Sequence, residues 1–397
     1  MTSDHADARP VQTVLVIGAG VAGGAAAFWL DHHGFDVTMI EKQATTEFDV
    51  GYLTDVNALG VDMLKRMGLL DAVREQAVSD PRLRMSVTRN NYVDLPLPSQ
   101  TTVVSRGVVT QLVHDAAASR VRVTAGTTVT RIEDHPDGVE VTFDDGGTAR
   151  FDLVVGADGL HSRTRRQIFG EDDTALTRRD LHTIWINVAT TDELRSFAAT
   201  MCYEGDVVTL AYPDRTQHLV CVTTSQPPGD DIESLRSYAA EVIRAGGKAI
   251  RPFADAVAVS DDVYLTPFAQ VRLDTWSRGR VVLVGDAAHC LDPLSGQGTN
   301  TALLGGYTLA GELRRAAGDH EQALRAYEDR LRPYTRLSQE IVAAGALYEA
   351  ASGLRERLPM VAKGLAEVAS TIAGMRPREV LGALRTRPQE YGPHNLA

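Results

Sequence analysis

Three closely spaced glycines constrain the fold of this chain more than any other feature. Gly18, Gly20 and Gly23 lie in VLVIGAGVAGGAAAFWL (14–30), where an apolar run typical of a buried strand changes to helical spacing. At a strand–turn–helix junction the first glycine allows a tight turn, the second admits a ligand close to the backbone, and the third lets the helix pack on the strand. The stretch therefore predicts a βαβ unit whose turn contacts a ligand.

An acidic residue ends the next predicted strand, 37–40. Glu41 follows Gly23 by 18 residues and precedes Lys42, and a carboxylate there accepts hydrogen bonds from a ribose. The N-terminus of the intervening helix, which includes Val21 and Ala22, directs N–H groups and partial positive charge at a pyrophosphate. Because an acid in this position disfavours a ribose phosphate, the pattern predicts FAD or NAD rather than NADP.

Composition limits the classes of partner. With 44% hydrophobic residues and a net charge of −12 over 397 residues, the chain matches a globular protein with a substantial core and disfavours nucleic acid as a partner. The three cysteines show no metal-ligand spacing, so we expect reduced thiols and no metal. The polar N-terminus and the lack of long uncharged runs predict a cytoplasmic protein without stable membrane association.

Two later segments carry a family resemblance. DLVVGADGLHSRTR (152–165) and GRVVLVGDAAHCLDPLSGQGTNTAL (279–303) resemble two signatures of the flavoprotein aromatic hydroxylases, the single-component class A monooxygenases typified by p-hydroxybenzoate hydroxylase. Together with the first glycine motif they occur in family order across some 300 residues. The resemblance implies FAD as the cofactor and NAD(P)H as a transient co-substrate.

The resemblance also implies roles for individual residues. Asp158 and Gly159 would lie near the FAD pyrophosphate, Arg106 near the phosphates, Asp286 beside the ribityl chain, and Pro293 near the reactive edge of the flavin. The remaining residues that we expect to bind the cofactor are Gly51, Tyr52, Val129, Gly285, Gly296, Gln297, Gly298, Thr299 and Asn300.

Some of these assignments have a plain structural alternative. Asp286 follows a predicted buried strand, where ligands bind in open α/β sheets, but an aspartate there also serves as a helix N-cap. Arg106 before a predicted helix is also compatible with a surface arginine. The glycines at 296 and 298 precede an apolar helix, so bare N–H groups there would stabilise the negative charge of a reduced flavin.

The predicted fold is a discontinuous Rossmann-like FAD-binding domain of the α/β class, with an inserted β-sheet substrate domain and C-terminal helices. We expect residues 1–175 and 276–397 in the FAD-binding domain, and 176–275, with part of 75–105, in the substrate domain. Tyr203, Tyr212, Pro213 and Phe268 are candidates for the substrate pocket, although an aromatic residue in a strand more often serves packing.

Local patterns predict several elements. The spacing in 55–70 indicates a helix, and the Val- and Thr-rich stretch 121–156 indicates a β-meander that ends in a buried strand. From about 298 to 375 the chain reads as mainly helical. Gly305 and Gly306 stand where the family often has an acidic residue.

The resemblance implies a monooxygenase that uses NAD(P)H and O₂ to hydroxylate or epoxidise an aromatic or polyketide-like molecule through a C4a-hydroperoxyflavin, as a monomer or homodimer. No single catalytic residue is indicated, because the cofactor supplies the chemistry. A flavin-dependent double-bond reductase, a halogenase of the same fold and a non-catalytic flavin-binding protein are the alternatives. The halogenase lacks support because no WxWxIP stretch occurs.

Overall fold

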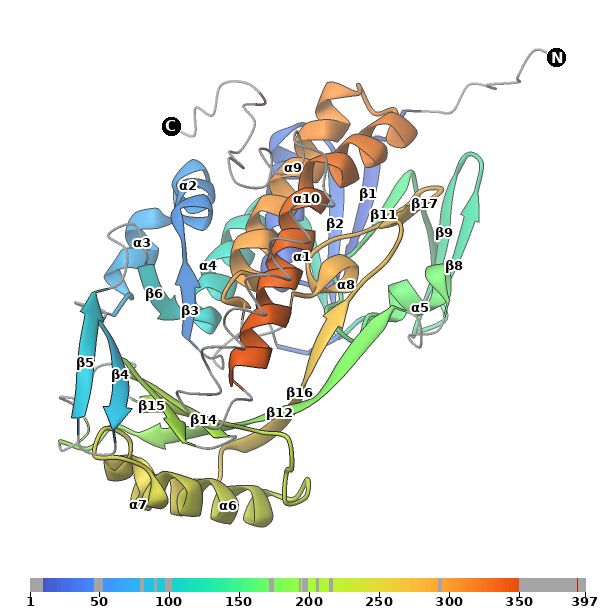
Figure 1. The fold of residues 1–397 in the computed structure, drawn as a ribbon. Coiled ribbons are helices and arrows are strands. Elements are labelled where there is room, and N and C mark those ends of the chain that lie inside the picture. The colour runs from blue at the N-terminus through green and yellow to red at the C-terminus, as the bar shows by residue number, and fades with distance from the viewer. Residues whose placement is uncertain are drawn as a thin grey trace.

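The structure is a computed structural model of the chain. It describes residues 10–45, 53–78, 82–88, 91–96, 102–170, 175–192, 194, 199–204, 207–213, 217–291, 295–349 and 391. Figure 1 shows two large sheets, with the long strands β12 and β16 extending from the lower sheet toward the upper one.

The first large sheet holds the predicted βαβ unit. Its strand order is β17-β18-β11-β1-β2-β7, with parallel pairing throughout except at the β17–β18 edge. Its strands are β1 (Thr13–Ile17), β2 (Asp36–Glu41), β7 (Arg122–Ala125), β11 (Leu153–Gly156), β17 (Ser277–Arg278) and β18 (Val281–Leu283). The central strands β1, β11 and β18 are almost wholly apolar because elements cover both faces of the sheet.

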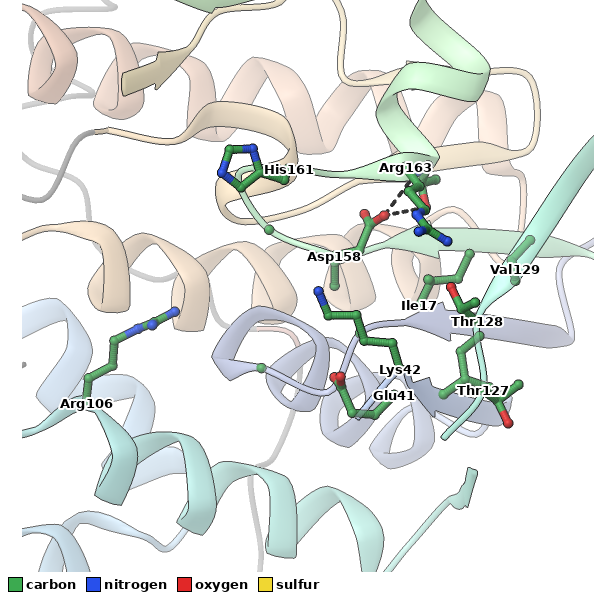
Figure 2. A pocket seen from close by; sticks show the side chains of 16 residues that line it. Ile17, Glu41, Lys42, Arg106, Thr127, Thr128, Val129, Asp158, His161 and Arg163 are labelled. Carbon is green, nitrogen blue, oxygen red and sulfur yellow. Dashed lines mark hydrogen bonds between the residues drawn. The ribbon is translucent and has the colours of Figure 1, made fainter. Parts of the chain in front are cut away.

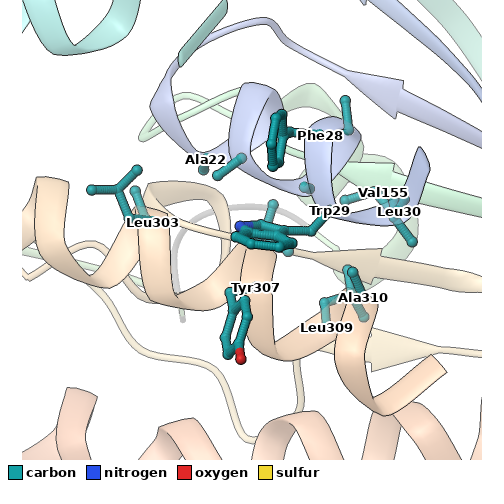
Figure 3. Packing of buried hydrophobic residues seen from close by; sticks show 14 of the residues in the cluster. Ala22, Phe28, Trp29, Leu30, Val155, Leu303, Tyr307, Leu309 and Ala310 are labelled. Carbon is teal, nitrogen blue, oxygen red and sulfur yellow. The ribbon is translucent and has the colours of Figure 1, made fainter. Parts of the chain in front are cut away.

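Helices cover one face of this sheet. They are α1 (Val21–His32), α4 (Arg106–Ala118) and α9 (Gly298–Arg315), and their apolar residues form one buried cluster with the sheet. A Cβ on Gly306 would lie 2.5 Å from the Ala26 nitrogen, so this glycine allows α9 to pack directly on α1. One turn further along α1, the Trp29 ring meets the Tyr307 ring of α9 edge to face, with 4.9 Å between the ring centroids (Figure 3).

A small antiparallel sheet covers the opposite face. It consists of β8 (Val129–His135), β9 (Gly138–Phe143) and β10 (Thr148–Phe151). Its valines pack on the apolar side chains of β1 and β11 that point to this face. The predicted meander over 121–156 is therefore only partly right. Its first and last strands, β7 and β11, do not pair with their neighbours in the sequence. They pair in parallel with β2 and β1 within the first large sheet.

The second large sheet has the order β16-β12-β15-β14-β13-β4-β5. Its strands are β4 (Arg82–Thr88), β5 (Asn91–Pro96), β12 (Leu176–Ala189), β13 (Ala199–Glu204), β14 (Val207–Pro213), β15 (Gln217–Thr224) and β16 (Val263–Val271). Helices α6 (Ile232–Ala245) and α7 (Ala254–Ala258) pack on one face through a second apolar cluster. The predicted α/β fold class is confirmed.

The predicted helix at 55–70 begins later than expected. Asp55 and Val56 belong to β3 (Leu53–Val56), which pairs with β6 (Thr102–Ser105). The helix α2 starts at Ala58 because the Asn57 side chain caps it, accepting from the Leu59 and Gly60 N–H groups at 2.9 and 3.2 Å. It ends at Arg66.

The remaining described elements are α3 (Leu70–Glu75), α5 (Arg163–Phe169), the 3₁₀ turn Arg251–Phe253, α8 (Asp286–His289) and α10 (His320–Glu349). The part of the predicted helical stretch beyond α10 lies outside the described residues. In the described parts of the chain, Cys221 and Cys290 are buried and form no disulfide. No helix among the described residues is long and apolar enough to span a membrane.

Candidate FAD-binding site

The first glycine turn, between β1 and α1, is built by close packing of backbone. Gly18 has a φ of +101°, and a Cβ there would lie 2.6 Å from the Ala157 carbonyl oxygen. A Cβ on Gly23 would lie 1.8 Å from the Gly18 oxygen. Gly20 differs, because nothing lies within 4 Å of its Cβ position. Two glycines therefore serve packing, whereas Gly20 leaves open space for a ligand.

Glu41 braces this turn from the end of β2. One carboxylate oxygen accepts the Ala19 N–H at 2.9 Å and the other accepts the Gln43 N–H at 3.0 Å. His114 on α4 lies behind the turn, bonded to the Ala19 backbone, and burial lowers its pKa from the ordinary value although the charges of Asp115 and Glu41 favour its protonated form. The carboxylate of Glu41 thus holds the turn, and Glu41 also lines the cavity described next.

A cavity of about 340 Å³ opens beside the first glycine turn. Figure 2 shows its lining, with Arg106 projecting from α4 and Glu41 and Lys42 from the end of β2. Eight of the residues predicted to bind the cofactor line it: Gly18, Gly20, Glu41, Lys42, Arg106, Val129, Asp158 and Gly159. The structure therefore brings together segments that are more than 100 residues apart in the sequence.

Eight further residues line the cavity and were not singled out from the sequence: Ile17, Ile40, Thr127, Thr128, Ala157, His161, Arg163 and Thr164. Most of them flank predicted residues, and His161, Arg163 and Thr164 belong to the segment 152–165. With Lys42 and Arg106, Arg163 gives the lining three basic side chains, beside the carboxylates of Glu41 and Asp158. Basic side chains suit the pyrophosphate of a dinucleotide.

Asp158 organises the loop that carries these residues. Its carboxylate accepts hydrogen bonds from the Ser162 hydroxyl at 2.5 Å and from the Thr164 N–H and hydroxyl at 3.0 and 3.1 Å. Ser162 in turn caps α5 by accepting the Arg165 N–H at 2.8 Å. Asp158 therefore shapes the cavity wall through its hydrogen bonds to this loop.

Arg165 connects this loop to the third motif. It is fully buried and donates to the Leu160 carbonyl at 2.6 Å and to the Ala287 carbonyl at 3.1 Å. Gly285, with φ +59°, lies so close to α1 that a Cβ would be 2.6 Å from the Ala22 Cβ. Asp286 is half-buried at the start of α8. The three sequence motifs thus meet around the first turn of α1.

His289, at the other end of α8, lies inside the protein. Its ring packs against Trp276, with 4.7 Å between centroids, and burial lowers its pKa to about 4. The imidazole is therefore neutral at pH 7 and has a packing role in this geometry.

The second glycine turn precedes α9 and is held by side chains. Asn300 is fully buried, and its side-chain oxygen accepts the backbone N–H of Asn57 at 3.0 Å. Its side-chain nitrogen donates to the backbone carbonyls of Asp55 and Gly296 at 2.8 and 3.2 Å. The Gln297 amide oxygen accepts from the Asn57 amide at 2.7 Å and from the Tyr334 hydroxyl at 2.8 Å. This network fixes the turn against β3, α2 and α10.

Two further contacts complete the network. The Thr54 and Thr299 hydroxyls are 3.0 Å apart. A Cβ on Gly60 would lie 2.2 Å from the Asn300 amide oxygen, so Gly60 makes room for this side chain. Sequence reasoning missed Asn57, Gly60 and Tyr334, because their partners are distant in the chain.

The other predicted residues fall in several places. Val21, Ala22 and Gly23 are buried in α1 and do not line the cavity of the first turn. Gly285, Asp286 and Gly296 to Asn300 do not line this cavity either. Gly51, Tyr52 and Pro293 lie outside the described residues. Of the substrate-pocket candidates, Tyr203 is in β13, Tyr212 and Pro213 are in β14, and Phe268 in β16 is 1% exposed, as expected for a packing role.

No cluster of three or more potential metal ligands occurs among the residues that the structure describes. The cavity lining presents open backbone at Gly20 together with basic side chains and carboxylates. The donor set in the 340 Å³ cavity fits the adenosine diphosphate half of FAD: open backbone at Gly20 and cations for the pyrophosphate, with Glu41 for the ribose.

Comparison with known proteins identifies the family. The FAD binding domain family matches residues 11–340. The chain belongs to the FAD-dependent aromatic hydroxylases. An uncharacterized protein of Mycobacterium tuberculosis is 32% identical over 347 residues, covering 84% of this chain and 93% of that protein. The FAD-dependent monooxygenase asL4 of Sarocladium schorii is 28% identical over 376 residues, covering 84% of this chain and 87% of the relative.

A solved structure agrees along almost the whole length. The tetracycline destructase Tet(55) superposes with a TM-score of 0.75 at 28% identity, covering 96% of this chain and 99% of that one. The protein described here is thus a flavin-dependent monooxygenase with FAD as its cofactor, and NAD(P)H is the electron donor typical of its family.

Proposed function

We propose that this enzyme uses NAD(P)H and O₂ to insert one oxygen atom into an aromatic or polycyclic small molecule. The observation that carries the proposal is the meeting of three motifs around α1, beside a cavity whose lining suits a dinucleotide. Relatives named monooxygenases support the reaction class. Bound FAD would supply electron transfer from the nicotinamide and oxygen transfer to the substrate.

The residues around the first turn have binding roles in this proposal. The N–H groups at Gly20 and the start of α1 hold the pyrophosphate, and the cations Lys42 and Arg106 neutralise its charge. Glu41 accepts hydrogen bonds from the adenosine ribose while it continues to hold Ala19. Asp286, half-buried at the start of α8, accepts hydrogen bonds from the ribityl chain.

The second turn has an electrostatic role. Its N–H groups at the N-terminus of α9 carry partial positive charge and stabilise negative charge on the pyrimidine side of the flavin. Because α9 is buried along most of its length, the turn is fixed before the cofactor binds and needs little reorganisation. Gly296 to Asn300 are therefore assigned to the isoalloxazine.

The second large sheet is assigned to the substrate. We keep residues 176–275, with part of 75–105, as the substrate domain, and residues 1–175 and 276–397 as the FAD-binding domain. The register pairs Tyr212 with Leu219 and Tyr203 with Val208, which places both tyrosines in the middle strands of this sheet. A monomer or homodimer remains the proposed assembly.

Turnover under ¹⁸O₂ tests the reaction. The FAD-loaded protein is mixed with NADH or NADPH and a polycyclic phenol, with tetracycline as the first candidate because Tet(55) is a tetracycline destructase. We expect substrate-stimulated NAD(P)H consumption and a product that carries one ¹⁸O atom. Substrate reduction without O₂ would favour a double-bond reductase, and an FAD-loaded protein that never oxidises NAD(P)H would contradict the proposal.

A further inference from the structure

A carboxylate lies beside the second glycine turn and is not used by the binding roles above. Asp55 is on β3, where it pairs with Val103 of β6. One of its carboxylate oxygens lies 3.8 Å from the position that a Cβ would take on Gly296. Its backbone carbonyl accepts the Asn300 amide at 2.8 Å, so the network of the second turn fixes this residue in place.

The carboxylate of Asp55 lies on an exposed residue between two buried neighbours. The flanking residues Thr54 and Val56 are buried, whereas Asp55 is accessible to solvent. Enough protein nevertheless surrounds the carboxyl group for desolvation to raise its pKa above the ordinary value.

The carboxylate has no partner within the described part of the protein. No hydrogen bond or ion pair to it occurs among the described residues, although Asp62 on the next helix is paired with Arg66 at 2.9 Å. The hydrogen bonds and ion pairs of the described residues give no structural reason for a carboxylate at this position. A role toward a bound group explains its position better.

We propose that Asp55 sets the reduction potential of the flavin by placing a carboxylate beside the turn that holds the isoalloxazine. This inference rests on the proposed placement of the ring at Gly296 to Asn300. Reduction of FAD adds two electrons and one proton, which leaves the ring with one net negative charge. The N-terminus of α9 favours this charge, and the carboxylate opposes it.

The opposing charge has a use in the reaction. A lower potential makes the reduced ring a stronger electron donor to O₂. Asp55 and the N-terminus of α9 would thus act on the same ring with opposite sign, so the potential depends on their balance. Asp55 is a specific candidate because it is the carboxylate that lies next to Gly296 among the described residues.

The midpoint potential of the bound flavin tests this role without any substrate. FAD-loaded parent protein, Asp55→Asn and Asp62→Asn are reduced anaerobically by xanthine and xanthine oxidase with a reference dye. We expect a more positive potential for Asp55→Asn and the parent potential for Asp62→Asn, because Asp62 is engaged with Arg66 on α2. Asp55→Glu should return the potential toward that of the parent.

Two results would contradict different claims. An FAD-loaded Asp55→Asn protein with the parent potential would overturn the role of Asp55 and leave the proposed function intact. A parent protein that takes up no FAD would overturn the proposed function. Asp55→Ser provides a second neutral side chain, so the comparison stays decisive where Asp55→Asn folds poorly.

Discussion

The two glycine turns of this enzyme begin helices that pack on each other, yet they are built in different ways. Around Gly18 and Gly23, backbone contacts backbone so closely that a Cβ has no room. Around Gly296 and Gly298, a Cβ would meet nothing closer than 3.8 Å, and side chains fix the turn through hydrogen bonds to Asn300 and Gln297. The first turn is specified by the lack of room for side chains. The second needs a glycine at Gly296, whose φ is +59°, but is held mainly by the identity of its side chains.

Gly23→Ala should have the largest effect. A Cβ 1.8 Å from the Gly18 oxygen forces α1 away from β1, and we expect a loss of roughly 3 kcal/mol or more in the free energy of unfolding together with loss of FAD binding. Thermal unfolding of the apoprotein and FAD titration measure the two effects.

Gly20→Ala is the matched control for the same turn. Its Cβ position is open and its φ is −67°, which alanine adopts readily. We expect parent stability with at least about tenfold weaker FAD binding, equivalent to about 1.4 kcal/mol. A variant that binds FAD like the parent would show that the ligand does not approach the backbone here.

Asn300→Ala tests the second turn. Removing the amide takes away the partner of the Asn57 N–H and of the Asp55 carbonyl in a partly buried setting, so we expect a loss of about 2 kcal/mol in urea unfolding. Gly298→Ala, whose Cβ position is empty, should change stability by less than about 0.5 kcal/mol. Equal effects of the two substitutions would remove the proposed difference between the turns.

The first turn should also be the more sensitive to acid. Burial lowers the pKa of His114 behind Ala19, so below the ordinary histidine value the unfolded chain binds a proton that the folded protein does not. The free energy of unfolding should therefore fall as the pH drops below about 6.5. The free energy of unfolding should depend less on pH in His114→Gln than in the parent. If urea unfolding at several pH values gives the two proteins the same pH dependence, His114 makes no such contribution.

Tyr334→Phe should have a smaller effect than Asn300→Ala. It removes one hydroxyl that donates to the Gln297 amide oxygen and keeps the ring. Asn57 still donates to the same oxygen, so we expect a loss of about 1 kcal/mol. A loss as large as that of Asn300→Ala would mean that α10, rather than β3, holds the second turn.

The difference between the turns also explains what the sequence could predict. The first turn follows from a local pattern, because Gly18, Gly20 and Gly23 lie within six residues and Glu41 follows one strand later. The contacts of the second turn join residues 37 to 245 positions apart. Such contacts leave no local periodicity, and Asn57, Gly60 and Tyr334 were therefore missed.

Asp55 shows the same limit at the level of secondary structure. The spacing of apolar residues over 55–70 predicts a helix, but pairing with β6 places Asp55 in a strand and Asn57 at the helix cap. Tertiary pairing overrides the local pattern here. Likewise, β7 and β11 have the composition of a meander and join a parallel sheet through distant partners.

A crystal structure of the FAD-loaded enzyme tests the central claim most directly. The account predicts the FAD pyrophosphate within hydrogen-bonding distance of the Gly20 N–H and the pyrimidine side of the isoalloxazine against Gly296 to Asn300. A pyrophosphate bound elsewhere, or a ring seated away from the second turn, would contradict the assignment of the two turns to the two halves of the cofactor.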